Sequence, residues 1–262
     1  MYENIEPKSC NPPGTHLETI SHPGEQDRSI EKAIIMEHRF AFFFWMKWYN
    51  QLQENHRLQQ TAPTLVTIDW HRDLAPVPDE QKEKLQKLDQ ENLSDVANYV
   101  WAQFEQTNDG HILCAAWLNL IGDIVLLQNT TQYQESKFTD KDGNTHYIYE
   151  IQKYEQFTDL MQQRDDRNII FDIDLDYFIH GKGSSQYSKN FSRYSDDEIK
   201  AIINHRNPVF QQMLPNIDGI TIAQEPGYCG GIRNSCHIMN VVHSQLFDDE
   251  GRWKHFAGNG NS

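Results

Sequence analysis

Two groups of acidic residues in this sequence have the types and spacing of metal ligands. In each group, the acidic or imidazole side chains occupy every second position after an apolar run: Asp69, His71 and Asp73 in the first, and Asp172 and Asp174 in the second. Alternate positions of a strand face one side, so each group can direct its side chains at one point. Carboxylates held that close repel one another unless cations lie between them. The spacing therefore predicts a metal site, with two ions as the expected number.

The ligand types narrow the choice of metal. Oxygen and nitrogen ligands without thiolates suit Mn or another ion of similar hardness better than a structural zinc. The chain has only four cysteines, with no close Cys-x-x-Cys pair: Cys10, Cys114, Cys229 and Cys236. This usage predicts free thiols in a reducing cytoplasm rather than a zinc site or a disulfide framework.

The elements that would position these residues alternate between strand and helix. Strands are expected at 30–36, 65–68, 124–127, 168–173 and 217–223, and a hairpin at 137–151 with its turn at Asp142-Gly143-Asn144. Helices are expected at 40–54, 81–106 with a break near Asn92, 111–120, 154–163, 196–204 and 231–247. This alternation predicts an α/β fold, a three-layer sandwich with a mostly parallel sheet.

The length of 262 residues fits one large domain. We expect an irregular N-terminal arm at 1–29, which is rich in Pro and Gly, a catalytic domain at 30–255, and a flexible tail at 256–262. No signal peptide is predicted from the polar first residues, and no apolar run is long enough to suggest a membrane span. A cytoplasmic protein is therefore expected.

Four candidate residues fall at or just beyond the carboxyl end of an expected strand: His38, Asp69, Asp172 and Glu225. In open α/β sheets, ligands bind outside the carboxyl ends of the strands. This shared placement favours a single site. The formal net charge of -15 argues against a nucleic-acid partner and favours a cationic substrate or partner.

The two motifs, Asp69-x-His71-x-Asp73 and Asp172-x-Asp174, resemble the metal-binding motifs of arginases and related ureohydrolases. Met36-Glu37-His38, the run from Asp172 to Phe178, and the run from Glu225 to Gly231 narrow the resemblance. They are similar to an arginase-like family whose characterised members are peptide arginases, which convert arginine to ornithine within ribosomally made peptides. The resemblance spans roughly residues 30–247 and implies an arginase-like fold.

The resemblance also implies roles for single residues. Asp69 and Asp172 would each bridge two Mn ions; His38 and Asp73 would complete one shell, and His71 and Asp174 the other. Water activated by the metals would attack the guanidinium carbon at neutral pH. Glu225 would pair with the guanidinium group. Asp174 is expected to take part in catalysis as well as in metal binding.

Other positions carry weaker expectations. His56 is a rival to His38 as a ligand, but it lies in a polar stretch. His111 matches, by its order in the chain, the histidine that carries protons in arginases, although a helix-capping role is an equal alternative. Asp109 and His180 are candidate substrate-binding residues. Asp176 is expected to support the site rather than to bind metal.

One segment departs from the arginases that act on free arginine. Residues 74–79 read Leu-Ala-Pro-Val-Pro-Asp, where those enzymes carry polar residues that hold the α-carboxylate and α-amine. This difference favours an arginine-containing precursor peptide as substrate. Two alternatives remain open: another C–N hydrolase of the ureohydrolase or deacetylase fold, or a non-catalytic metal-stabilised domain that binds basic peptides.

Overall fold

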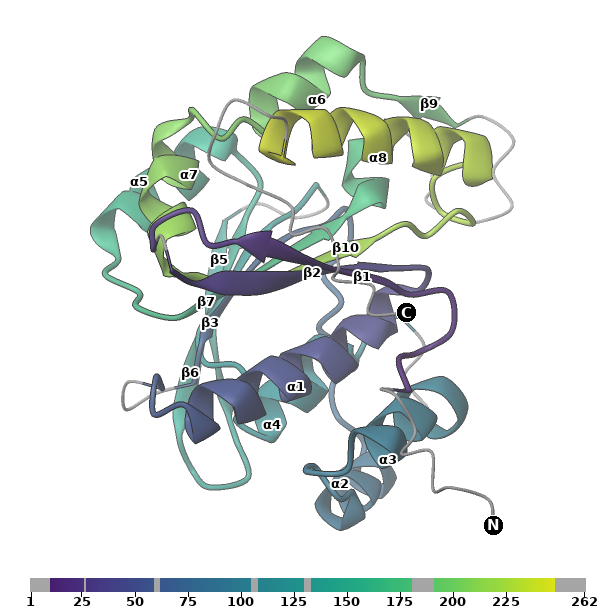
Figure 1. Cartoon of the computed structure of the whole chain (residues 1–262), viewed down its shortest axis with the longest axis vertical. Helices are drawn as coiled ribbons and strands as arrows, with labels where there is room; N and C mark the ends of the chain where they lie inside the picture. Colours follow the sequence, from purple (N-terminus) through teal and green to yellow (C-terminus); the bar gives the residue numbers. More distant parts are fainter. Residues whose placement is uncertain are drawn as a thin grey trace.

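An eight-stranded sheet forms the middle of the protein (Figure 1). The computed structural model describes residues 10–25, 27–58, 62–104, 108–129, 133–180 and 191–247. The sheet has the order β1-β2-β10-β7-β3-β4-β6-β5. Its strands are β1 (His16–Ser21), β2 (Ser29–Ile35), β3 (Thr64–Ile68), β4 (Ile124–Leu127), β5 (Gln134–Thr139), β6 (Thr145–Ile151), β7 (Ile169–Asp174) and β10 (Ile217–Ala223). The six central strands pair in parallel, whereas the edge strands β1 and β5 pair antiparallel to their neighbours.

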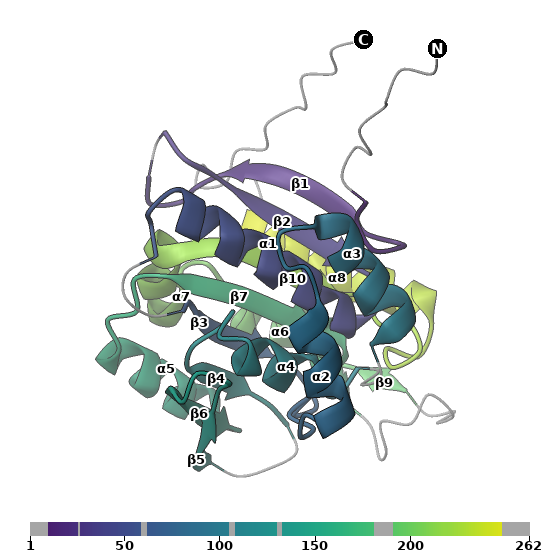
Figure 2. The ribbon, with the colours of Figure 1, turned by 90° about the horizontal axis from the view of Figure 1, so that it is seen from below.

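Helices cover both faces of the sheet, which gives three layers (Figures 1 and 2). One layer contains α1 (Ala41–Glu54), α2 (Asp79–Lys87), α3 (Leu93–Asn98), a single π-helical stretch (Tyr99–Gln103) and α4 (His111–Trp117). The other contains α5 (Tyr154–Gln163), α6 (Asp196–Ile202), α7 (Pro208–Met213) and α8 (Ile232–Phe247). The small pair of β8 (Ile179–His180) and β9 (Ser192–Arg193) forms a separate antiparallel sheet.

Alternation along the central strands divides the apolar side chains between two cores. In β7, Ile169, Phe171 and Ile173 join the core beneath α5–α8, whereas Ile170 joins the core beneath α1 and α4. Because successive strand residues face opposite sides, Asp172 and Asp174 share the face of Ile170. The acidic motif of β7 therefore faces the layer of α1 and α4.

The expected α/β class, the three layers and the mostly parallel sheet are confirmed. The hairpin is also confirmed, since β5 and β6 pair antiparallel around Gly143. Asn92 caps α3, and its side-chain oxygen accepts the backbone N–H of Ser94 at 3.1 Å, which explains the break between α2 and α3.

Three features differ from the sequence-based expectation. Residues 1–29 were expected to be irregular, but β1 and the first residue of β2 lie within them. That part of the expectation is wrong, because β1 adds an antiparallel edge to β2. Helix α7 and the short helix Leu175–Phe178 were not expected from the sequence. The flexible tail at 256–262 lies outside the described residues, so it stays a prediction, as does the domain boundary at 255.

Candidate metal centre

The centre is built on the carboxyl ends of three neighbouring strands. Register places Thr67 of β3 beside Asp172 of β7, and Asp172 beside Thr221 of β10. Asp69 follows β3 and shares the parity of Thr67, so it faces the same side. Both threonine hydroxyls donate to the carboxylate of Asp172, that of Thr67 at 2.7 Å. Neighbouring side chains thus hold the Asp172 carboxylate rigidly at the strand ends.

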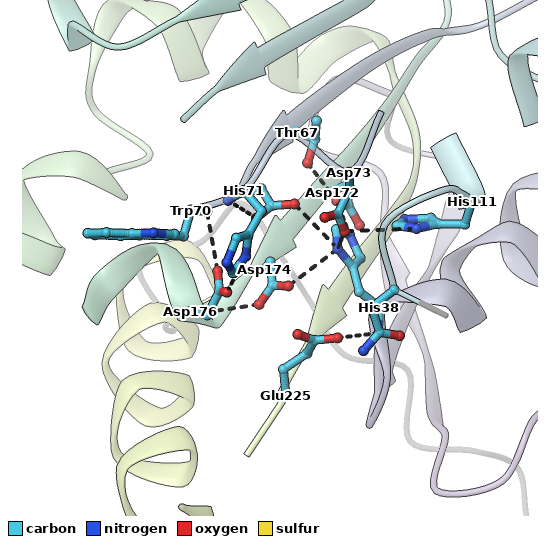
Figure 3. Close-up of polar contacts among 12 residues, drawn as sticks. His38, Thr67, Trp70, His71, Asp73, His111, Asp172, Asp174, Asp176 and Glu225 are labelled. Carbon is cyan, nitrogen blue, oxygen red and sulfur yellow. Dashed lines mark hydrogen bonds and ion pairs between the residues drawn. The ribbon is translucent and has the colours of Figure 1, made fainter. Parts of the chain in front are cut away.

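His38 lies among four carboxylates (Figure 3). Its Nε2 is 2.8 Å from Oδ2 of Asp172, and its Nδ1 is 3.0 Å from Asp73, 3.3 Å from Asp174 and 3.5 Å from Asp69. Two atoms bound to one ion at about 2.2 Å can be separated by at most about 4.4 Å. The Asp69–His38 distance therefore meets the condition for ligands of one ion.

The chain after β2 places His38 at this point. A short helix, His38–Phe40, leads directly into α1, whose first six residues are all buried. This aromatic stretch anchors α1 against the sheet, and Trp45 Nε1 donates to Thr221 Oγ1 at 3.3 Å. The rival ligand, His56, lies on the exposed surface just beyond the far end of α1. Only His38 of these two histidines is brought to the acidic cluster.

His71 contacts the cluster through Asp176. Its Nδ1 lies 2.9 Å from Oδ2 of Asp176 and 3.9 Å from Oδ1 of Asp69. The backbone N–H of Trp70 donates to the other oxygen of Asp176 at 3.2 Å, while the Trp70 ring points away from the carboxylates (Figure 3). A carboxylate on one ring nitrogen fixes the orientation of a histidine and leaves the other nitrogen for a metal. The expected supporting position of Asp176 fits this contact.

Glu225 closes the remaining side of the cluster. Its Oε1 accepts the backbone N–H of His38 at 3.0 Å, and its carboxylate lies close to those of Asp174 and Asp176. Two residues here have a left-handed backbone that costs a non-glycine residue free energy: Asp73 at φ 47° and Glu225 at φ 35°. Such strain persists where the surrounding structure imposes it, often at functional sites.

The six carboxylates of the centre are all buried, with at most 8 % of any residue exposed: Asp69, Asp73, Asp172, Asp174, Asp176 and Glu225. Burial, reinforced by the neighbouring Asp176, raises the pKa of Asp174 to about 7. Burial and nearby carboxylates likewise raise the pKa of Asp69 and of Glu225. Burial alone would lower the pKa of His38, but Asp172 and the other carboxylates raise it well above its usual value. Burial and mutual repulsion therefore disfavour the charged forms of these carboxylates, which nearby cations would stabilise.

The donor set fits metal ions. Asp69 Oδ2 and the ring nitrogens of His111 are buried without a hydrogen-bonding side chain among the described residues. Buried polar atoms without partners are costly, and a cation supplies the missing interaction. The ligand atoms also form several groups of three within 4.8 Å of one another, including His38–Asp69–Asp174 and Asp69–His71–Asp73. These residues can therefore hold one or two ions.

His111, expected as a proton carrier, lies inside the protein at the first position of α4. Its ring is 0 % exposed and packs edge-on against His38, with ring centroids 4.3 Å apart, and near Trp45 at 5.4 Å. Burial, and then the charge of His38, lower the pKa of His111 well below its usual value, while the backbone of Asn108 acts in the opposite direction. Its Nδ1 is 4.0 Å from Oδ2 of Asp73.

A cavity of about 570 Å³ opens onto the centre. Its lining combines members of the centre with residues of two flanking loops: His71, Arg72, Asp73, Leu74, Ala75, Pro76, Asn108, Asp109, Glu225 and Tyr228. The expected substrate-binding residue Asp109 is exposed at this cavity. His180 is also exposed, but its ring stacks on Tyr194 at 4.0 Å and is not part of this lining. Residues 181–190, which follow it, lie outside the described residues.

Sequence reasoning missed one ion pair at the centre. The guanidinium of Arg72, between two predicted ligands, binds the fully buried carboxylate of Glu150 through Nε at 2.5 Å and Nη2 at 2.6 Å. The available signal was a lone glutamate among the apolar and aromatic residues in the second half of β6, since a buried carboxylate requires a partner. This pair ties the ligand loop to β6.

Comparison with known proteins gave little further information. No protein-family model and no curated protein matches the chain. Among solved structures, the chain is similar to proclavaminate amidino hydrolase from Streptomyces clavuligerus, with a TM-score of 0.41 and 11 % identity. The match covers 81 % of this chain and 62 % of that chain. Within the described residues, no helix is long and apolar enough to cross a membrane.

Proposed function

We propose that this protein is a dinuclear manganese hydrolase that converts peptidyl arginine to ornithine and releases urea. The observation that carries the proposal is the number of buried carboxylates around one point. Six negative charges face the four positive charges of two divalent ions, which leaves two negative charges next to the cavity. Buried charges are stable only when they are paired, so a substrate with its own positive charge fits the site.

The guanidinium group of arginine is such a substrate. It is planar, positively charged and able to donate two parallel hydrogen bonds to one carboxylate. Glu225 lines the cavity and is held in place by the His38 N–H, so its carboxylate is preorganised to receive this group. A guanidinium pairs one of the two surplus charges, whereas the neutral amide of a deacetylase-like reaction would pair neither.

Each residue has a distinct part in the proposed reaction. His38, His71, Asp69, Asp73, Asp172 and Asp174 would hold two Mn ions, and the chemistry such ions supply is a lowered pKa of water, which would allow attack at neutral pH. Glu225 orients the guanidinium carbon for addition of water. The bond from this carbon to the side-chain nitrogen then breaks, and that nitrogen takes up a proton to leave as the ornithine amine. Asp174, which faces both His38 and Glu225, is positioned to carry this proton.

The cavity wall favours an arginine within a peptide. The lining segment that follows the ligand Asp73 is Leu74, Ala75 and Pro76, which offers no side-chain group to an α-carboxylate or α-amine. Arg72 is the only lysine or arginine among the described lining residues, and Glu150 already neutralises it with two short hydrogen bonds. The proposed partner is therefore an arginine-containing precursor peptide, and the cytoplasm is the proposed location.

A urea assay tests this function. The Mn-loaded protein should release urea from a peptide with an internal arginine, and chelation of the metal should abolish the release. A peptide with lysine in place of arginine serves as the matched control, because it keeps the positive charge and lacks the guanidinium carbon. No urea from a range of arginine peptides by a protein that holds two Mn ions would contradict the proposal.

A further inference from the structure

We infer that His111 is a metal ligand, joining His38 and Asp73 on one ion, and not an exposed proton carrier. This inference rests on the proposed function only in assuming that the centre binds metal. It changes the expected ligand set from six residues to seven, because His111 was expected to act from outside the metal shells.

The surroundings of His111 are inconsistent with a proton carrier. A group that exchanges protons with substrate or water must reach them, but the ring is 0 % exposed and is not part of the cavity lining. The ring is enclosed by His38 on one side and Trp45 on another. Asn108 and Asp109, just before it in the chain, line the cavity instead. The backbone thus turns His111 inward, towards the carboxylates.

Neither ring nitrogen of His111 has a hydrogen-bonding side chain among the described residues, and the backbone of Asn108 can satisfy at most one of the two. The buried imidazole of His22 shows the contrast, since it donates to the Ile217 carbonyl and accepts the N–H groups of Gly24 and Glu25. A buried imidazole nitrogen that is left without a partner is costly unless something binds it. A metal ion supplies that interaction, and imidazole is a common ligand of Mn and related ions.

The distances fit a shared ion. Nδ1 of His111 lies 4.0 Å from Oδ2 of Asp73, and ligand atoms of His38, Asp73 and His111 all lie within 4.8 Å of one another. Two ligands on opposite sides of one ion, with bonds of about 2.2 Å, are about 4.4 Å apart. Shifts of a few tenths of an ångström would therefore bring all three onto one ion. His111 reaches this point because it opens α4, whose seven residues are all buried.

The test compares metal binding in two variants. His111→Phe keeps an aromatic ring in the buried space but removes both nitrogens. His146→Phe is the matched control, since His146 is also buried and packs near Phe138, with its nitrogen 3.3 Å from Asp140 and outside the centre. Mn content and Mn affinity are measured by titration without substrate, together with the melting temperature of each chelated variant.

The affinity for one of the two ions should fall by at least about 100-fold in His111→Phe. Loss of a residue that only hydrogen-bonds to a ligand already lowers metal affinity by about 10–100-fold, and loss of a direct ligand should lower it further. His146→Phe should bind both ions as the unmodified protein does. Unchanged affinity for both ions in His111→Phe would overturn the inference.

If His111→Phe does not fold, Mn bound to the unmodified protein, labelled with ¹⁵N-histidine, is examined by pulsed electron paramagnetic resonance. Couplings from three histidine nitrogens are expected, and couplings from only two would overturn it. Urea release plays no part in this test, so its failure and that of the proposed function are distinguishable.

Discussion

Replacing Glu225 with glutamine isolates the charge that the account assigns to substrate binding. The variant keeps the length of the side chain and an oxygen that can accept the His38 N–H, which is 3.0 Å away in the structure. It removes only the negative charge opposite the guanidinium group. Because Glu225 is not needed to hold the ions in this account, the Mn content of Glu225→Gln should remain unchanged.

The size of the effect follows from the burial of Glu225, which is 5 % exposed. Removing one partner of a buried ion pair costs about 3–5 kcal/mol, which corresponds to a fall in kcat/KM of roughly 100-fold to 5,000-fold. The assay is urea release from an arginine peptide at several substrate concentrations. Asp142→Asn, an exposed change in the β5–β6 turn, is the control and should leave kcat/KM unchanged. An active Glu225→Gln enzyme with unchanged kinetics would refute the pairing of Glu225 with substrate.

Three further changes give separate predictions. Asp172→Asn should lower Mn content and abolish urea release, because Asp172 would bridge both ions; a variant with two ions and full activity would contradict this role. Without metal, the melting temperature should fall as pH rises from about 4 to about 7, since burial raises the folded-state pKa of Asp174 from 3.8 to about 7 and its protonated form stabilises the fold. Added Mn should remove this fall. A chelated protein whose melting temperature does not change with pH would contradict the repulsion among the carboxylates. Gly219→Ala should lower the free energy of unfolding by about 1–3 kcal/mol, because the added methyl group overlaps the Trp48 ring. Gly227→Ala, where the added atom meets nothing within 4 Å, should be tolerated in the same denaturation assay, and equal effects would contradict the packing argument.

The position of the centre could be predicted from the sequence because its main candidate ligands follow the alternation of residues along a strand. Asp69 and Asp172 follow apolar strands, and alternation alone determines which side of the sheet they face. The choice of His38 over His56 depended on the end of β2, and the structure brings only His38 to the carboxylates. The roles of these residues in metal binding and catalysis stay predictions until metal and activity are measured.

Other parts of the centre depend on contacts that no local pattern encodes. The pair of Arg72 and Glu150 joins positions 78 residues apart, and its existence depends on β6 lying one strand beyond β4, the neighbour of β3. His111 was expected at the start of a helix, but its burial depends on the packing of α4 against α1, where its ring lies near that of Trp45. Asp73 adopts a positive φ, which alternation along an extended strand does not predict. Alternation along the strands was therefore sufficient to place the side chains at the strand ends, but it could not place the residues of the loops around them.

The most direct test of the central claim follows one arginine peptide and the bound metal in the same sample. Protein loaded with Mn is analysed for metal, then incubated with a peptide that has an internal arginine, and the product is identified by mass spectrometry. We expect two Mn ions per chain, ornithine in place of arginine, and one urea per ornithine. Free arginine should be used at least about 100-fold less efficiently by kcat/KM, because contacts along the peptide orient the reacting side chain. Unmodified peptide after incubation with the two-ion protein would contradict the claim, and equal use of free arginine would contradict its peptide specificity.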